Sequence, residues 1–211
     1  MILAMLFKEP MLFLAWLVAI FYGITVHEFA HAWVAVKQGD ETPRAMGRVS
    51  LNPLAHLDLM GLLMLLFAGF GWGKPVPVNP NNFKHGKASD NLVSLAGIFT
   101  NIISIAIFGL VLKLVITYTS LGGDNLLINF LSMLIMINLV LAVFNIIPIP
   151  PLDGSHVLFN ILPDRYNELK FNLAKNGPFI LLILIIADNF LNIGIFSSLF
   201  NFFLNLIYRV F

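Results

Sequence analysis

Three residues near the N-terminus, His27, Glu28 and His31, could together bind and use a metal ion. On a helix, positions i and i+4 lie on one face, so His27 and His31 present their imidazoles one turn apart. That spacing suits two ligands of a tetrahedral Zn²⁺ ion, and Glu28 could act as a general base on water at that ion. The pattern His-Glu-x-x-His therefore predicts a metal site with two protein ligands and a base.

The surrounding sequence is unusually apolar. Of the 211 residues, 59% are hydrophobic and only 11% are charged, whereas a soluble domain carries about 25% charged residues. This composition predicts an integral membrane protein. The net charge of +1 argues against nucleic acid as a partner. The chain has no cysteine, so any metal must be held by His, Asp or Glu.

A catalytic zinc site usually has three protein ligands and an open position, so a third ligand is expected from another segment. Asp153 is a candidate, because it follows a proline-rich helix break of a kind tolerated in membranes only beside a cavity or packed protein. His156 is a rival, since it could share a helical face with Asp153, and Asp188 is a weaker one. Asp153 could instead be a helix N-cap, and Asn145 an interhelical hydrogen bonder. The other histidines, His56 and His85, lie in polar loops.

The hydrophobic segments predict an all-α polytopic membrane protein. A helical span needs about 20 apolar residues, and residues 11–36, 91–118 and 126–147 meet this requirement. Residues 59–70 are short and glycine-rich, which predicts a re-entrant or partial span. Residues 73–90 alternate valine with proline at first, which predicts a membrane-associated extended loop or a small β-sheet.

The C-terminal part is expected to hold one or two further helices. Residues 178–211 contain more apolar residues than one span requires, and Asp188-Asn189 interrupts them. A polar segment, residues 163–177, precedes them. We expect residues 1–211 to form a single membrane domain, with a catalytic core over about 11–160 and helices over about 178–211. The N-terminus lacks a basic leader, so we expect no cleaved signal peptide.

Basic residues predict the orientation in the membrane. Six Lys or Arg residues lie within 37–87 and three within 163–177, whereas the loop 119–125 has none. Cytoplasmic loops carry the excess of basic residues, so the first two segments are expected in the cytoplasm and the third outside. His27 to His31 then lie in the cytoplasmic half of their span, roughly 15 Å from its end, on the same side as Asp153.

Two motifs together resemble the site-2 protease family of intramembrane zinc metalloproteases, peptidase family M50. They are His27-Glu28-Phe29-Ala30-His31 and Asn145-x-x-Pro148-x-Pro150-x-x-Asp153-Gly154. Asn52-PLAHLDLMG, Gly73-KPVPVNP and Gly97-IFTN resemble further family elements in the expected order. The chain departs from the family pattern at Ile98 and Leu59, where the family often has proline. It resembles a minimal, short form without PDZ or CBS domains.

The resemblance implies one Zn²⁺ ion held by His27, His31 and Asp153. Glu28 would activate water for attack on the scissile carbonyl, and Asn145 would orient substrate or stabilise the developing oxyanion. The implied substrate is the transmembrane segment of a single-span membrane protein, cut near the cytoplasmic face of a bacterial inner membrane. Because helical peptide bonds are sheltered, the substrate must unwind locally. The segment Gly73-KPVPVNP could pair with it by strand addition, or could be an ordinary interfacial loop.

Two other functions use the same residues. A membrane metal transporter or metal-sensing protein could use the His and Glu side chains as a transit site, but transporters usually show repeated halves and this chain shows none. An inactive relative could bind membrane substrates without cutting them, although the intact motifs argue against it. The sequence does not indicate the oligomeric state.

Overall fold

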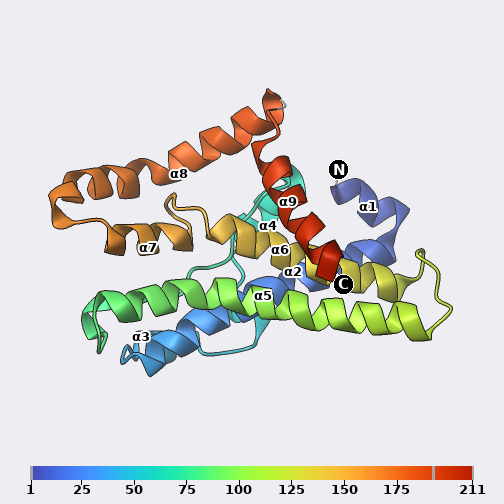
Figure 1. The fold of residues 1–211 in the computed structure, drawn as a ribbon, viewed down its shortest axis with the longest axis horizontal. Coiled ribbons are helices and arrows are strands. Elements are labelled where there is room, and N and C mark those ends of the chain that lie inside the picture. Colours follow the sequence, from blue (N-terminus) through green and yellow to red (C-terminus); the bar gives the residue numbers. More distant parts are fainter. Residues whose placement is uncertain (1, 192, 211) are drawn as a thin grey trace.

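The computed structural model describes residues 2–191 and 193–210, and these residues form helices joined by loops (Figure 1). The long helices are α2 (Pro10–Lys37), α5 (Lys87–Tyr118), α6 (Leu126–Asn145) and α8 (Asn167–Phe190). The shorter ones are α1 (Ile2–Lys8), α3 (Thr42–Ala45), α4 (Leu59–Ala68), α7 (Asp153–Ile161) and α9 (Ile195–Val210). Single 3₁₀ turns occupy Pro53–Ala55, Pro80–Asn82 and Asp164–Tyr166.

Within the described residues, four helices are long and apolar enough to cross a membrane. They are α2, α5, α6 and the segment Asp164–Asp188, most of which belongs to α8. The 28 residues of α2 extend over about 42 Å, which exceeds the roughly 30 Å of a bilayer core. The protein is therefore an all-α polytopic membrane protein, as the composition and the hydrophobic segments predict.

Helices α2, α5 and α6 pack on one another to form the centre of the molecule. Helix α5 runs antiparallel to the other two, so the end of α2, the start of α5 and the end of α6 meet at one end of the bundle (Figure 1). A buried apolar cluster joins α5 and α6, made of Ile105, Ile135, Leu139 and Val143. The same three helices also enclose fully buried polar side chains, which need partners inside the protein.

Helix α4 is too short to cross the membrane and matches the expected partial span. Its ten residues extend over about 15 Å. Its N-cap is Asp58, whose Oδ1 accepts a hydrogen bond from Gly61 N at 2.8 Å. The chain then turns back and packs against α4. The contact is so close that a Cβ on Gly71 would lie 2.1 Å from the Gly61 carbonyl oxygen. An isolated β-bridge between Leu57 and Gly73 joins the segments before and after α4.

The alternative of a small β-sheet over residues 73–90 is wrong for the part of the chain that the structure describes. Residues 74–79 adopt no regular structure, and the single bridge does not extend into a ladder. Proline at positions 75, 77 and 80 removes backbone donors from this segment, which limits strand pairing. An extended loop, the other half of the prediction, is what the structure shows.

The C-terminal region holds two helices, but they begin and end at other residues than the hydropathy pattern predicts. Helix α8 starts at Asn167, includes most of the polar segment 163–177, and continues through Pro178. The break falls after Phe190, and Asp188 belongs to the helix. The Asp188 carboxylate accepts hydrogen bonds from Ile195 N and Phe196 N at the start of α9. The first turns of α8 were not predicted, because their residues are polar and hydropathy does not distinguish a polar helix from a loop.

A buried carboxylate ties the end of α2 to the loop before α5. Asp40 is fully buried and accepts hydrogen bonds from Thr42 N, Thr42 Oγ1, Asn79 N and Asn82 Nδ2, at 3.2, 2.6, 2.7 and 2.8 Å. Burial acts to raise the pKa of Asp40, but the hydrogen bonds from Thr42, Asn79 and Asn82 outweigh it and lower that pKa. The charged form of Asp40 therefore stabilises the fold.

We expect Asp40→Ala to lower the free energy of unfolding by about 2–4 kcal/mol, because it leaves buried donors without an acceptor. Thermal unfolding of the detergent-solubilised protein measures this, with the exposed Asp124→Ala as matched control. Because the folded pKa lies below the ordinary value of 3.8, the stabilisation by Asp40 is present above that pH and is lost as the pH falls below it. Equal stability of the two variants would contradict this role.

Candidate metal centre

Helix α2 and the start of α7 bring three ligand-type side chains together. His27 and His31 lie one turn apart on α2, with their Nε2 atoms 3.0 Å apart. Asp153 Oδ2 lies 3.1 Å from His27 Nε2 and 3.2 Å from His31 Nε2. Among the described residues, these three form the group whose ligand atoms lie within 4.8 Å of one another. The two histidines are buried and Asp153 is half-buried.

The position of Asp153 depends on a close contact between α7 and the end of α6. A Cβ on Gly154 would lie 2.3 Å from the Ile146 carbonyl oxygen, so only glycine allows this approach. The N-cap of α7 is Leu152, and the Asp153 side chain makes no capping hydrogen bond. The alternative of Asp153 as a helix N-cap is therefore wrong.

Hydrogen bonds to the other ring nitrogens determine which tautomer each histidine adopts. His27 Nδ1 lies 2.6 Å from Asn101 Oδ1, and Asn101 Nδ2 donates to Asn138 Oδ1 at 2.8 Å and to Gly23 O at 3.3 Å. Because the amide nitrogen is used as donor, the oxygen of Asn101 must accept from His27. His31 Nδ1 donates to the Val93 carbonyl oxygen at 2.7 Å. Both Nε2 atoms therefore carry lone pairs.

Three electron-pair donors thus meet at one buried point. Asp153 Oδ2 has no hydrogen-bond partner within the described part of the chain, although two imidazole nitrogens lie close to it. Lone pairs that face one another in a buried site favour a cation between them, which is either a proton or a metal ion. Two imidazoles and a carboxylate with one further position open form a catalytic zinc donor set, so the residues fit a zinc ion.

Gly97 of α5 makes room for the two imidazoles. A Cβ at this position would lie 2.5 Å from both His27 Cε1 and His31 Nε2. These distances are far below van der Waals contact, and the helix backbone cannot move away without disturbing α5. Asn101 lies one turn after Gly97, so one face of α5 supplies both the space and the hydrogen-bond acceptor for His27.

Glu28 is held by the loop that follows α4. Its Oε2 accepts a hydrogen bond from Val76 N at 3.1 Å. Its Oε1 faces Gly73, where a Cβ would lie 3.6 Å from that oxygen. A Cβ on Gly73 would also lie 2.8 Å from Ile24 Cγ2, so the loop passes close to α2. One carboxylate oxygen is thus fixed by the loop, and the other has no hydrogen-bond partner among the described residues.

The loop itself is fixed by Arg48 and His56, which the sequence analysis did not select. Arg48 is buried and donates to the carbonyl oxygens of Lys74 and of Pro75, the latter at 2.8 Å. His56 Nε2 donates to Ser50 O at 2.7 Å, and its Nδ1 lies 3.4 Å from Arg48 Nη2. Burial lowers the pKa of Arg48, while the charge of Glu28 acts in the opposite direction. His56 lies in a loop, as expected, but it is fully buried.

The remaining candidates lie apart from the three convergent ligand atoms. His156 is exposed, and Asp188 caps α9. Neither joins the group of ligand atoms among the described residues. Asn145 is the last residue of α6, and its Nδ2 donates to the Leu141 carbonyl oxygen at 3.0 Å. That hydrogen bond leaves the Asn145 side-chain oxygen at the helix end, and a role in catalysis stays a prediction.

A polytopic membrane protein that joins a His-Glu-x-x-His helix to a distant aspartate at one buried site has the make-up of a membrane-embedded metallopeptidase. Comparison with known families agrees with this class. Residues 53–187 match the profile of peptidase family M50, a range that begins after His31 and includes Asp153. The chain belongs to peptidase family M50, the site-2 protease family, and is a zinc metalloprotease.

Several curated proteins are similar to this chain. YwhC of Bacillus subtilis, named as a candidate zinc metalloprotease, is 38% identical over 177 residues, which are 81% of this chain and 79% of that protein. Rip2 of Mycobacterium tuberculosis, named in the same way, is 31% identical over 83% of this chain and 65% of its own length. Zinc metalloprotease MJ0392 of Methanocaldococcus jannaschii is 25% identical over 79% of this chain and 41% of its own length. No solved structure matches the chain.

We expect Gly97→Ala to lower the zinc content of the purified protein about tenfold or more, because the added methyl group overlaps both imidazoles. Zinc per chain, measured by atomic emission after dialysis, tests this. Gly122→Ala is the matched control, since no atom lies within 4 Å of a Cβ there. A normal zinc content in Gly97→Ala would contradict the predicted position of the metal.

We expect Asn101→Ala to weaken zinc binding about 10–100-fold, because His27 loses the acceptor that selects its tautomer. Asn101→Asp should keep most of the affinity, since a carboxylate also accepts from His27 Nδ1. Competition with a zinc chelator measures both values. The exposed Asn172→Ala serves as control. If Asn101→Asp bound zinc as weakly as Asn101→Ala, acceptance of this hydrogen bond would not be the reason.

Proposed function

We propose that the protein is an intramembrane zinc endopeptidase that cuts the transmembrane segment of a single-span membrane protein near the cytoplasmic face. The observation that carries this proposal is the convergence of His27, His31 and Asp153 from α2 and α7. Glu28 follows His27 directly on α2. Helix α2 is long and apolar enough to cross the membrane. A hydrolytic site within such a helix suits a substrate that also lies in the membrane.

The residues divide the chemistry between them. We propose that His27, His31 and Asp153 hold one zinc ion, which when bound supplies Lewis-acid polarisation of a carbonyl and acidification of water. Glu28 then takes the proton of the attacking water through the oxygen that the loop leaves free, and later gives it to the leaving amine. Asn145 would donate a hydrogen bond to the developing oxyanion from the second hydrogen of its amide nitrogen, since the first is donated to the Leu141 carbonyl oxygen.

The arrangement of the bundle supports a site that faces the cytoplasm of a bacterial cell, in its inner membrane. The end of α2, the start of α5 and the end of α6 lie at one end of the molecule (Figure 1). The loops between α2 and α5 carry most of the basic residues in the first half of the chain. Cytoplasmic loops carry such an excess. His27 lies ten residues before the end of α2, nearer this end than the other.

The backbone of the loop from Gly73 to Asn79 supports the proposal that the substrate binds in an extended, unwound form. Lys74 and Pro75 use their carbonyls to accept from Arg48, and Val76 N donates to Glu28. Among the described residues, Val76 O and Val78 N have no hydrogen-bond partner. In an extended segment these groups lie on the same edge as Val76 N. A substrate strand added at this edge would lie next to Glu28.

A membrane metal transporter or metal-sensing protein is the alternative for the same site. It would use the three ligands but would need no base. Family M50 membership and the names of the relatives support the protease instead.

We expect Glu28→Gln to retain zinc and to cut about 10²–10⁴-fold more slowly, because the amide cannot take a proton. Cleavage of a single-span reporter protein in vesicles and zinc per chain are measured together. The exposed Glu168→Gln is the matched control. Equal cleavage by Glu28→Gln and wild type would remove Glu28 from the chemistry, and a zinc-loaded wild type that never cuts such reporters would contradict the proposed substrate class.

A further inference from the structure

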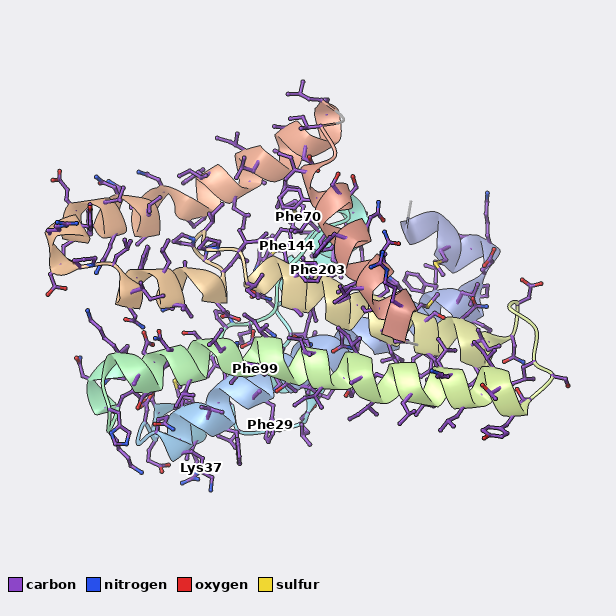
Figure 2. The ribbon with its side chains drawn as sticks, in the orientation of Figure 1. Phe29, Lys37, Phe70, Phe99, Phe144 and Phe203 are labelled. Carbon is purple, nitrogen blue, oxygen red and sulfur yellow. The ribbon has the colours of Figure 1, made fainter. Side chains whose placement is uncertain are left out.

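A groove of about 410 Å³ runs between α2 and α5, outside the metal centre. Its walls come mainly from apolar side chains of the two helices, with Lys37 and Gln38 at the end of α2. The lining residues that would contact a bound molecule include Ala30, Trp33, Val34, Lys37, Ala96 and Phe99. Figure 2 shows Phe99 on α5 and Lys37 at the end of α2.

The groove opens toward the bilayer rather than toward the site of hydrolysis. Trp33 is 49% exposed and Phe99 is 57% exposed, although both are large and apolar. On a helix of 3.6 residues per turn, Ala30 lies about 200° around the axis from Glu28. The catalytic base therefore faces away from the groove. In a membrane, an apolar groove with this exposure is filled by a lipid chain.

The mouth of the groove carries positive charge without a counter-ion. Lys37 Nζ lies 5.6 Å from the centre of the Trp33 ring. Lys84 does not line the groove, but its Nζ donates to the Lys37 carbonyl oxygen at 3.2 Å, which places a second ammonium group at the C-terminal end of α2. In the described part of the chain neither lysine forms an ion pair. The nearby carboxylates have other partners, since Asp40 is fully hydrogen-bonded and Glu41 pairs with Arg44.

We propose that this groove is a binding site for an anionic phospholipid. One acyl chain lies along Ala30, Val34, Ala96 and Phe99, and the phosphate lies between Lys37 and Lys84. Basic pockets between transmembrane helices at a membrane face bind anionic head groups, and tryptophan favours the same level. A zwitterionic lipid would fit the apolar part equally well, but it would leave the two ammonium groups without a net negative charge.

The site lies next to the candidate metal centre, on adjoining faces of α2 and α5. Ala30 precedes His31 on α2, and Ala96 precedes Gly97 on α5. A bound acyl chain would therefore pack on the outside of the two helices whose inner faces enclose the imidazoles. This inference goes beyond the proposed protease function and does not depend on it, because lipid binding can be measured without any substrate.

Trp33 provides the measurement, because bromine on an acyl chain quenches tryptophan only on contact. The full chain carrying Trp16→Phe and Trp72→Phe keeps Trp33 as its single tryptophan. It is placed in phosphatidylcholine vesicles that contain brominated phosphatidylglycerol or, separately, brominated phosphatidylcholine at equal mole fraction. We expect phosphatidylglycerol to quench Trp33 at a markedly lower mole fraction. Each lysine is expected to contribute about fivefold, from roughly 1 kcal/mol per basic residue.

Charge variants test the assignment. Lys37→Gln and Lys84→Gln should each lose about fivefold of the preference, and the double variant should treat the two lipids alike. Lys113→Gln, which removes an exposed charge from the other half of α5, should keep the full preference. Unchanged circular dichroism shows that each variant is folded. High salt should also weaken the preference by screening.

Three results would overturn the proposal. Equal quenching by the two lipids in the parent protein would mean a general acyl-chain contact. A preference that survives in the double variant, or is lost equally in Lys113→Gln, would place the head group elsewhere. Quenching by neither lipid, together with protection of Trp33 by a transmembrane peptide, would make the groove a peptide site.

Discussion

The structure depends on one electrostatic requirement inside an apolar helix bundle. Two imidazole nitrogens and a carboxylate oxygen meet with their lone pairs facing one another, and Asp153 Oδ2 has no hydrogen-bond partner within the described residues. In a medium of low polarity this arrangement is unfavourable unless a cation lies between the three atoms. A metal ion at this point would offset the burial of His27, His31 and Asp153, and the fold around them keeps the three ligand atoms together.

Neighbouring residues restrict the tautomer, the ring positions and the approach of the three ligand side chains. Asn101 selects the tautomer of His27, and Asn101 is itself oriented because Asn138 accepts from its amide nitrogen. Gly97 leaves the volume that the imidazole rings occupy, and Gly154 lets α7 approach α6 closely enough to deliver Asp153. Residues without acid–base chemistry of their own thus determine the geometry of the site. They lie on α5, α6 and α7, so the packing of α5 against α2, α6 and α7 determines where the ligand atoms of α2 and α7 meet.

Local patterns predicted the elements that have one dominant signal. The i and i+4 spacing of His27 and His31 implied a shared face. The proline break before Asp153 predicted backbone that lines a cavity or packs against protein, and the close contact of Gly154 with Ile146 agrees with packing. His56 and Arg48 were missed because a polar loop sequence does not reveal that its side chains are buried, and their partners are backbone carbonyls that any residue could supply. The first turns of α8 were missed because their polar composition fits a loop as well as a helix. Tertiary contacts decide such cases.

The face of α2 that carries Glu28 and the face that carries Ala30 and Trp33 have different neighbours. The buried ligand atoms of His27 and His31 separate these two faces. One side holds Glu28 against the loop, where its carboxylate accepts a hydrogen bond from Val76 N. Another, marked by Ala30 and Trp33, opens to the bilayer. His27 and His31 lie between these sides, against Gly97 of α5. A membrane protease must bring water to one face of a helix while hydrocarbon covers another. Arg48 donates to the carbonyl oxygens of Lys74 and Pro75 and so fixes the loop that contacts Glu28. Because Arg48 is buried within the protein, its charge is not exposed to lipid.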